Sequence, residues 1–501
     1  MNLNFKTAPY KHQLDYLTRF GGRTTCALLA EMGTGKSWMV INDFAQLARE
    51  GKCDRVLIFA PNGVHRNWSL IELPKHMPDD IRWHELSWSP KKSKSFTNAK
   101  AEFIKKRPGV LSVLTMNWEA LQHNSGFEYA KQFVEGGDNV MIVCDESDAI
   151  KNPTALRTKN LMALKPYSRY RRIMSGTPIA SSPFDLFSQF RFLNTTILGT
   201  SYYSFKAAFA QMATDQSWIV KSVREKIEAK TGKPSKQKIQ IVEKIDGKPA
   251  YKNLDRLAAM IEPHSFRVRK KDCLDLPDKI YSTTVVQMTS EQQAAYDKAK
   301  DELRIMYEHE ETPINKLAAL SKLAQITSGY YLHPLADEPV RIPGDNPKLE
   351  ALVERVTAAV AGGEQVIVWA RYTVQADDVY QALTKAGLRC GVYNGQTSSD
   401  DRVQLIDDFQ ANNVDVLVGN QQAGGTGITL TAATLVVYFS NDFSLRNRLQ
   451  SEDRAHRIGQ TKSVLYLDLV AEGTIDEAVV RALQHKTSVA KAVLDEGFGM
   501  L

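Results

Sequence analysis

The chain has 501 residues, of which 43% are hydrophobic and 24% charged, a globular composition with room for two to four domains. The formal net charge of +7 is mild, so it is compatible with a polyanionic partner without requiring one. Five single cysteines without C-x-x-C pairs, no membrane-length apolar run and no signal-peptide stretch predict a soluble, cytoplasmic protein without a zinc site.

The first third of the chain alternates short apolar runs with helix-like segments. The runs are rich in β-branched residues and lie at 26–32, 55–61, 110–116, 140–146 and 171–178. This rhythm is typical of a parallel sheet covered by helices on both faces. We therefore predict an α/β lobe over residues 1–195.

The segment 28–38, LLAEMGTGKSW, joins the first apolar run to a helix-like segment and matches a phosphate-binding loop, except that Ala30 replaces the first glycine. Glycines allow backbone N–H groups to wrap a phosphate, and the positive end of the next helix faces the same anion. Lys36 is expected to reach the β- and γ-phosphates, and the Ser37 hydroxyl to bind Mg²⁺. The loop residues expected to hold ATP are Met32, Gly33, Thr34, Gly35, Lys36 and Ser37.

Two adjacent acids, Asp145 and Glu146, end the apolar run at 140–146. A carboxylate at the end of a buried strand is costly unless it is used. In a phosphate-loop enzyme, Asp145 would hold the Mg²⁺ shell and Glu146 would orient or deprotonate the attacking water. A simple helix-capping turn would account for Asp148, although not for the two adjacent acids.

The middle of the chain, 196–345, is predicted to be a helical insertion and lobe linker. Its strongest helical patterns lie at 290–311 and 314–332. The stretch 221–240 holds seven basic and two acidic residues. A solvated loop or hairpin tip and a protrusion that binds a polymer backbone both remain open for this stretch, with the loop slightly favoured.

The last third repeats the strand rhythm and predicts a second α/β lobe over 346–485, followed by a helical tail over 486–501. Its apolar runs lie at 365–370, 390–395, 415–420, 434–440 and 463–470. No repeat of solenoid period is present.

Arg454 and Arg457 are three residues apart, so a helix would present both on one face, with Gln450 one turn before. Arginines presented in trans to a γ-phosphate stabilise the charge of the transition state by about three to five powers of ten in rate. A surface helix with ion pairs from Glu452 and Asp453 is the competing interpretation of this segment.

In this order the motifs resemble superfamily 2 helicases and, more narrowly, the Swi/Snf type of double-stranded DNA translocase. The resemblance covers nearly the whole chain. It rests on AEMGTGKS (30–37), LIFAPNGVHRNW (57–68), LTMNWEAL (114–121), DESDAIKNP (145–153), RIMSGTP (172–178), FRVRKKDCLDLPDK (266–279), NPKLEAL (346–352), YNGQTSSDDRVQLIDDF (393–409), QQAGGTGITLTAATLVV (421–437) and QSEDRAHRIGQ (450–460).

The resemblance implies two RecA-like lobes, ATP and Mg²⁺ as cofactors, and a site shared between the lobes. The catalytic residues it implies are Lys36, Asp145, Glu146, Gln450, Arg454 and Arg457. Ser37 and Asp145 would hold Mg²⁺, and Tyr10, Gln13 and Gly427 would join the loop in holding ATP. The implied nucleic-acid contacts are Arg66, Asn67, Thr115, Asn117, Lys151, Asn152, Arg371, Gly395, Gln396, Gly424, Gly425, Thr426 and Phe443.

Two departures from the family pattern affect which nucleic acid the chain is expected to move along. The acidic box is DESD where relatives usually carry His at its fourth position, and Phe443 stands where relatives carry Trp.

The expected function is ATP-driven translocation of a monomer along duplex DNA, contacted through its backbone without sequence specificity. A strand-separating or branch-migrating helicase, on DNA or RNA, is the alternative. A non-catalytic ATP-gated clamp is disfavoured because the site residues are all present. The compact chain favours a bacterial or virus-infected cell and association with the nucleoid.

Overall fold

The computed structural model describes most of the chain, and its residues group into two compact units. Unit 1 comprises residues 1–273 and 488–501, and unit 2 comprises residues 274–487. No helix in the described part of the chain is both long and apolar enough to cross a bilayer. The described residues are 4–62, 64–91, 93–214, 216–231, 241–245, 248–308, 313–332, 338–421, 428–491 and 494.

Unit 1 is built on a seven-stranded sheet in which all neighbouring strands run parallel. The strand order across the described sheet is β3-β4-β2-β5-β6-β1-β9. The strands are β1 (Thr25–Ala30), β2 (Arg55–Ala60), β3 (Trp83–Ser87), β4 (Leu111–Asn117), β5 (Val140–Asp145), β6 (Tyr170–Met174) and β9 (Ser265–Val268).

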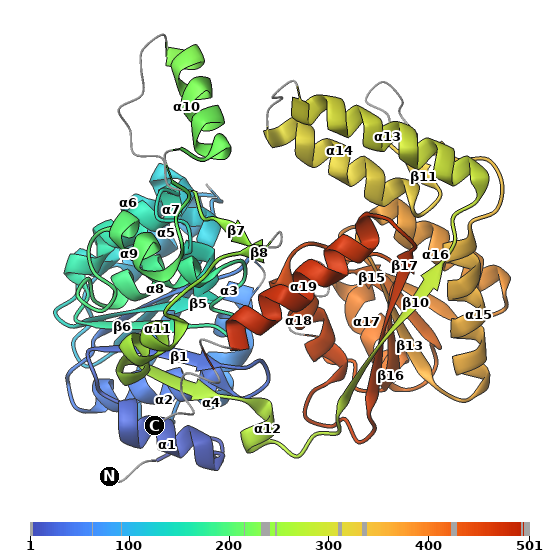
Figure 1. Ribbon diagram of the computed structural model, residues 1–501. Helices are drawn as coiled ribbons and strands as arrows, with labels where there is room; N and C mark the ends of the chain where they lie inside the picture. Colours follow the sequence, from blue (N-terminus) through green and yellow to red (C-terminus); the bar gives the residue numbers. More distant parts are fainter. Residues whose placement is uncertain are drawn as a thin grey trace. The chain divides into compact units, whose positions relative to one another are not determined.

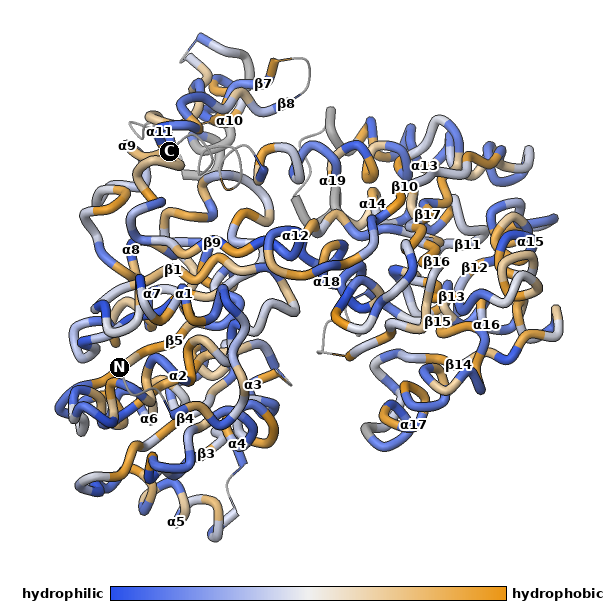
Figure 2. The backbone as a smooth tube through the Cα atoms, turned by 90° about the horizontal axis from the view of Figure 1, so that it is seen from below, coloured by the Kyte–Doolittle hydropathy of each residue, from blue (hydrophilic) through white to orange (hydrophobic). Residues whose placement is uncertain are grey.

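Alternate side chains of each central strand enter two different cores, one on each face of this sheet. In β1, Ala27 and Leu29 pack in one core, whereas Cys26 and Leu28 pack in the other. Helices therefore cover both faces (Figure 1), and the apolar strands β1 and β5 stand out in Figure 2. The main helices are α1 (Lys11–Phe20), α2 (Lys36–Arg49), α3 (Val64–Asn67), α4 (Leu73–His76), α5 (Lys94–Phe103), α6 (Asn124–Glu135), α7 (Leu156–Leu164), α8 (Leu186–Leu193), α9 (Tyr202–Phe209), α10 (Trp218–Thr231), α11 (Leu254–Ile261) and α12 (Lys270–Cys273).

Shorter elements complete unit 1. One turn of π-helix, η1 (Trp68–Glu72), continues directly from α3. The short 3₁₀ helices are η2 (Trp118–Gln122), η3 (Ser147–Ile150), η4 (Lys165–Tyr167), η5 (Pro183–Asp185) and η6 (Glu262–His264), and β7 (Lys244–Ile245) pairs with β8 (Lys248–Pro249).

Unit 2 contains a six-stranded parallel sheet in the order β10-β17-β16-β13-β15-β14. Its strands are β10 (Lys279–Val286), β13 (Gln365–Ala370), β14 (Cys390–Tyr393), β15 (Val416–Asn420), β16 (Ala433–Tyr438) and β17 (Val464–Ala471). Its helices are α13 (Ser290–Glu308), α14 (Pro313–Ile326), α15 (Pro347–Ala361), α16 (Thr373–Lys385), α17 (Ser399–Gln410), α18 (Leu445–Ala455) and α19 (Ile475–Lys491), and β11 (Tyr330–Tyr331) pairs with β12 (Val340–Arg341).

The predicted fold class, two parallel-sheet α/β lobes, is confirmed, but the predicted boundaries at 195 and 345 do not follow the sheets. β9 and β10 both lie in the predicted insertion, yet each is an edge strand of one of the two sheets. The loop preferred for 221–240 is wrong for its first part, because α10 continues to Thr231. Residues 232–240 lie outside the described residues.

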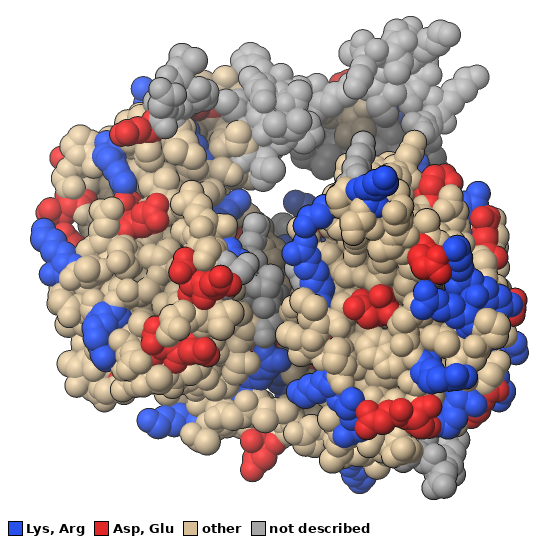
Figure 3. Space-filling model, turned by 180° about the vertical axis from the view of Figure 1, so that it is seen from behind, with Lys and Arg blue, Asp and Glu red and all other residues tan. Residues whose placement is uncertain are grey.

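Basic and acidic side chains are interspersed on the face of the molecule drawn in Figure 3. This mixture agrees with the mild net charge of +7. Charge alone therefore does not mark a polymer-binding region on this face, and the candidate site is located from the strand ends.

Candidate nucleotide site and nucleic-acid interface

The phosphate loop lies between β1 and α2, where the backbone takes conformations that favour glycine. Gly33 has φ 78°, and Gly35, the residue that caps α2, has φ 80°. A Cβ on Gly35 would lie 2.2 Å from the Gln13 Nε2 atom, so a side chain would be strained by the positive φ and would have to displace the Gln13 amide. These turns direct the chain from the strand end into the N-terminus of α2, which is the geometry of an anion-binding loop.

The Lys36 ammonium lies folded back over the loop. Its Nζ atom donates to the Ala30 carbonyl at 3.0 Å and to the Glu31 carbonyl at 3.4 Å. The Thr34 hydroxyl also donates to the Glu31 carbonyl, at 2.7 Å. The ammonium therefore lies within the loop and is bonded only to carbonyl oxygens in the described contacts, which a phosphate can replace.

The first turn of α1 closes one side of the loop. The Gln13 Oε1 atom accepts from the Tyr10 amide at 2.9 Å, and its Nε2 atom lies 3.5 Å from the Thr34 carbonyl. His12 Nε2 lies 2.8 Å from the same carbonyl. Tyr10 is half exposed, and its ring stacks on the His12 ring at 5.8 Å. Gln13 and Tyr10, the two predicted base-reading residues, thus lie beside the loop.

The two acids lie at the end of β5, with one strand, β6, between them and the phosphate loop. Asp145 Oδ2 accepts from the Trp68 indole N–H at 3.0 Å, and Oδ1 accepts from the Glu146 amide at 3.0 Å. Glu146 has φ 50°, a left-handed conformation that is uncommon for a residue with a side chain. Such a strained residue at a strand end is typical of functional positions.

The carboxyl group of Asp145 is harder to ionise than a carboxyl group in water. Burial, reinforced by the neighbouring Glu146, raises the pKa of Asp145 to about 6, while the Trp68 hydrogen bond and the Lys36 ammonium act in the opposite direction. A cation placed beside this carboxyl would stabilise its charged form. The site is thus suited to a divalent metal ion.

The Ser-Gly-Thr-Pro turn after β6 lies between the two motifs. Its Ser175 hydroxyl lies 3.4 Å from Glu146 Oε2, and the Ser175 amide donates to the Leu28 carbonyl of β1 at 3.2 Å. Ser147 Oγ donates to Gln189 Oε1 at 2.7 Å. The turn therefore links the acid pair to the strand that carries the phosphate loop.

The two candidate arginines of unit 2 converge on one carbonyl oxygen. Nη1 of Arg454 lies 3.5 Å from the Ile428 carbonyl, and Nη1 of Arg457 lies 3.3 Å from it. The expectation that one helix presents both is wrong, because α18 ends at Ala455 and Arg457 follows the helix. The chain reversal after α18 brings the two guanidinium groups together instead.

The competing interpretation of α18, a surface helix with ion pairs, is confirmed for a pair of Glu452 with an arginine, Arg448, but is wrong about the surface position of Glu452. Glu452 is buried and accepts from Arg448 Nε at 2.8 Å, from Lys279 Nζ at 3.0 Å and from the Tyr281 hydroxyl at 2.8 Å. Neither Arg454 nor Arg457 is among these partners. The buried network of Arg448, Glu452 and Lys279 joins α18 to the edge strand β10 and fixes the helix on the sheet.

A family model described as "SNF2-related domain" matches residues 12–330, which is more than half of the chain. The chain belongs to the SNF2-related family. A second model, described as "Helicase conserved C-terminal domain", matches residues 347–459. The first match includes the phosphate loop and the acid pair, and the second includes both arginines of unit 2.

Members of this family similar to the chain include proteins from bacteria and fungi. The putative ATP-dependent helicase/translocase YwqA of Bacillus subtilis is 25% identical over 97% of this chain and 48% of its own length. The ATP-dependent helicase fft1 of Schizosaccharomyces pombe is 24% identical over 93% of this chain and 50% of its own length. The chain thus spans about half the length of these curated relatives. A solved SWI2/SNF2 ATPase core of Sulfolobus solfataricus, in complex with dsDNA, is 25% identical, with a TM-score of 0.41, over 99% of this chain and 95% of the other.

The nucleic-acid contacts expected from the family in unit 1 follow the carboxyl ends of three neighbouring strands, β4, β2 and β5. Arg66 is exposed, Asn152 is exposed, and Lys151 reaches the Ser181 hydroxyl at 3.1 Å. Asn67 is partly exposed, and Asn117 caps η2 by accepting from the Ala120 amide. These side chains therefore all lie at the carboxyl ends of the strands of the unit 1 sheet.

Thr115 does not belong with these side chains. It is fully buried in β4, and its hydroxyl is 3.0 Å from the Ser69 hydroxyl. The expectation that its side chain contacts a polymer is therefore wrong for this conformation. Thr115 instead holds η1, the turn that follows Arg66 and Asn67, against the sheet.

The nucleic-acid contacts expected in unit 2 lie in several different environments. The Arg371 guanidinium lies over the Tyr372 ring at 5.0 Å, and Phe443 packs against the apolar cluster that contains Leu445. The backbone N–H of Gln396 donates to Asn394 Oδ1 at 2.9 Å, and no atom would lie within 4 Å of a Cβ placed on Gly395. Gln450 is buried within α18. Gly424, Gly425, Thr426 and Gly427 lie outside the described residues.

Two tryptophans that contact the acid pair were missed from the sequence. Trp68 donates to the Asp145 side chain, and Trp118 donates from Nε1 to the Asp145 carbonyl at 3.0 Å. Both rings are almost fully buried. A buried indole must find an acceptor for its N–H, so the residue type signalled a partner without saying which one.

Proposed function

We propose that the chain is an ATP-hydrolysing motor that moves along duplex DNA. The observation that carries this proposal is the convergence of Lys36, Asp145, Glu146 and Ser175 at the carboxyl ends of adjacent strands in unit 1. Membership of the SNF2-related family supports it, as do relatives named ATP-dependent helicases and, in one case, helicase/translocase.

In this proposal Lys36 exchanges its carbonyl partners for the β- and γ-phosphates of ATP, while the loop amides and the N-terminus of α2 hold the same phosphates. Glu146 orients or deprotonates the water that attacks the γ-phosphorus. Its contact with Ser175 keeps the carboxylate at the strand end. Gln13 and Tyr10 bind the base at the side of the loop.

The residues present fit Mg²⁺ bound together with a nucleotide. Each oxygen of Asp145 accepts one hydrogen bond, which leaves lone pairs for a cation or its water ligands. Among the described residues there is no cluster of three or more His, Cys, Asp or Glu side chains that could hold a metal alone. Mg²⁺ commonly takes one or two protein ligands and completes its shell with phosphates and water, so Asp145 and Ser37 suffice. Bound Mg²⁺ would neutralise charge that develops on the phosphates.

We infer that Arg454 and Arg457 act on the γ-phosphate from unit 2, with Gln450 supporting them, when ATP draws the two units together. In the described conformation both guanidinium groups lie at the Ile428 carbonyl. Phosphate is a stronger partner for a guanidinium than a neutral carbonyl. Hydrolysis removes that partner, so alternate closure and opening would drive stepping.

The track would be held through its phosphates by Arg66, Asn67, Asn117, Lys151 and Asn152 in unit 1. Arg371, Gly395, Gln396, Phe443 and the 424–426 loop are the candidates in unit 2. Contacts of this kind depend on salt and are indifferent to base sequence.

The test is ATP hydrolysis by the purified chain with Mg²⁺ and duplex DNA, single-stranded DNA or RNA. We expect duplex DNA to stimulate hydrolysis most, Lys36→Ala to abolish it, and Arg457→Ala to lose turnover while ATP still binds. Full activity of Lys36→Ala would exclude the site. Stimulation by single strands or RNA would favour a strand-separating helicase, and binding without hydrolysis would favour an ATP-gated clamp.

A further inference from the structure

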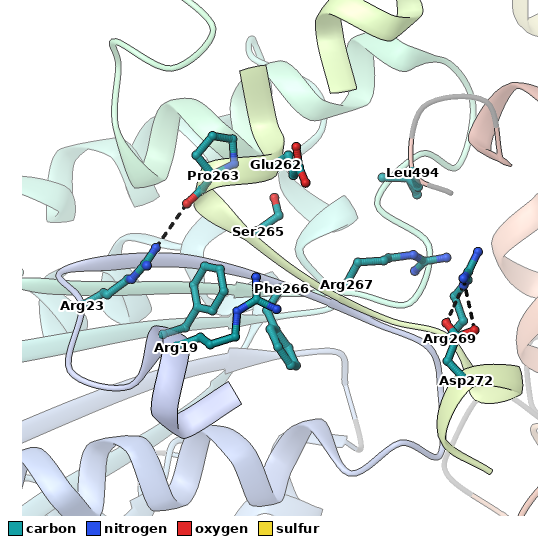
Figure 4. Close-up of a pocket in the computed structure, with 11 residues that line it drawn as sticks. Arg19, Arg23, Glu262, Pro263, Ser265, Phe266, Arg267, Arg269, Asp272 and Leu494 are labelled. Atoms are coloured by element: carbon teal, nitrogen blue, oxygen red, sulfur yellow. Dashed lines mark hydrogen bonds and ion pairs between the residues drawn. The ribbon is translucent and has the colours of Figure 1, made fainter. Parts of the chain in front are cut away.

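A second hollow in unit 1 is lined by arginines and lies between the end of α1 and the edge strand β9 (Figure 4). Its volume is about 580 Å³, which is within the range of small-molecule sites. Arg19 and Arg23 approach it from α1 and the turn that follows, and Arg267 and Arg269 from β9 and its exit. No residue of the proposed ATP site lines this hollow.

Arg19 and Arg23 are oriented by aromatic rings. The Arg23 guanidinium lies 4.3 Å from the centre of the Phe20 ring, and the Arg19 guanidinium lies 5.7 Å from Phe20 and 5.9 Å from Phe266. Arg23 also donates to the Pro263 carbonyl at 3.2 Å. Stacking restricts a guanidinium but leaves its N–H edge available, so less entropy is lost when an anion binds. Within the described chain, no carboxylate is within ion-pair distance of either arginine.

The opposite wall is partly neutralised. Arg269 forms a two-pronged pair with Asp272, at 2.6 and 3.1 Å. Arg267 donates to the Leu29 carbonyl at 3.1 Å and lies 3.5 Å from Glu31 Oε1. Both arginines of this wall therefore already have protein partners, which an incoming anion would have to displace.

We propose that this hollow binds a multivalent phosphate ligand, such as the di- or triphosphate group of a small molecule. Guanidinium groups bind phosphate oxygens in pairs, and all four cations here are arginines. Because these groups come from two walls, a chain of linked phosphates matches them better than a single phosphate. The volume favours a small molecule over a protein segment.

The hollow is also connected to the phosphate loop. The Glu31 amide donates to the Val268 carbonyl at 2.9 Å, and Glu31 Oε2 accepts from the Lys270 amide at 2.9 Å. A ligand that takes Arg267 therefore removes one of the tethers of Glu31, the residue whose carbonyl receives Lys36. Occupation of the hollow would in this way alter ATP binding, and ATP would alter the ligand's affinity by the same factor.

The test is titration calorimetry with pyrophosphate on the whole chain, after the ATP site has been filled with a non-hydrolysable ATP analogue and Mg²⁺. We expect one additional site. The pair of substitutions Arg19→Gln and Arg23→Gln should weaken it at least tenfold. The matched control is Arg82→Gln with Arg107→Gln, two exposed arginines that line a different hollow of the same unit. The control removes equal charge and should leave the affinity unchanged.

Absence of the additional site, or equal weakening in both pairs, would overturn the proposal. A hexaglutamate peptide is titrated in the same way. If this peptide binds at the same arginines more tightly than pyrophosphate does, the hollow binds an acidic protein segment instead. If the analogue itself does not bind, the proposed ATPase function fails, while pyrophosphate binding that depends on Arg19 and Arg23 still supports this site. Arg269→Gln provides a second variant, with weakening expected here also.

Discussion

Replacement of Trp68 by Phe tests one hydrogen bond to Asp145, the acid proposed to bind magnesium. A smaller aromatic ring remains, but the N–H that donates to Asp145 Oδ2 at 3.0 Å is lost. A hydrogen bond to a charged acceptor contributes about 1.5–3 kcal/mol, and one pKa unit corresponds to about 1.4 kcal/mol. The bond favours the ionised carboxylate, so its loss should raise the pKa of Asp145 by about 1–2 units.

The assay is the pH dependence of kcat/KM for Mg²⁺-ATP, which reports ionisations of the free enzyme. Since the ionised carboxylate is the form proposed to bind Mg²⁺, we expect activity to fall as pH drops through the pKa of Asp145, about 6 in the native chain. In Trp68→Phe this acid limb, the part of the profile where activity falls at low pH, should move to a higher pH, about 7–8. Glu146 and Lys36, the charged groups that also act on Asp145, are unchanged in the variant.

Trp118→Phe is the matched control. Trp118 is as deeply buried as Trp68, but its N–H donates to the Asp145 backbone carbonyl rather than to the carboxyl group. Its acid limb should therefore remain near that of the native chain. An unchanged limb in Trp68→Phe, or equal shifts in the two variants, would refute the argument that this hydrogen bond tunes the acid.

Three further substitutions test the surroundings of the site. Arg172→Met should lower the free energy of unfolding, measured by urea titration, by about 3–5 kcal/mol, because the fully buried Asp43 loses its ion pair at 2.8 Å. Adding Asp43→Leu to this variant should restore part of the lost stability. Gly35→Ala should weaken ATP binding in a calorimetric titration while circular dichroism stays native, because φ is 80° and the new Cβ would displace the amide of Gln13, a residue proposed to bind the base. Asp145→Asn should raise Tm more at pH 8 than at pH 4.5. Because the pKa of Asp145 is raised from 3.8 to about 6 by folding, the stability of the native chain falls as the pH rises through this range, and the neutral amide of the variant removes this loss.

The parts of the molecule that could be predicted from the sequence are those with a local chemical signature. The loop that ends in Lys36 and the acids after β5 were recognisable because phosphate and Mg²⁺ chemistry restricts the residue types. Most sheet strands were recognisable as apolar runs. β3 was missed because WHELS is half polar and only partly buried.

Other features depend on contacts between distant segments and have no local signal. Ala27 of β1 pairs with Ser265 of β9, so the edge strand is identified only by its partner. Arg457 was misplaced on a helix because the end of α18 at Ala455 is determined by tertiary packing. Thr115 was expected at the surface, yet its position inside the apolar run 110–116 already indicated a buried strand.

The placement of β9 and β10 determines where the gene can be divided. A fragment ending near residue 195 would lack β9 and would leave the backbone of β1, an interior strand, unpaired along one side. A fragment starting near residue 346 would lack β10 and expose β17 in the same way. Such edges recruit other chains, so both fragments should aggregate. During synthesis, the first sheet is completed only after residue 268 has left the ribosome, so the nascent chain carries an open edge at β1 from the emergence of β6, which ends at Met174, until β9 has emerged.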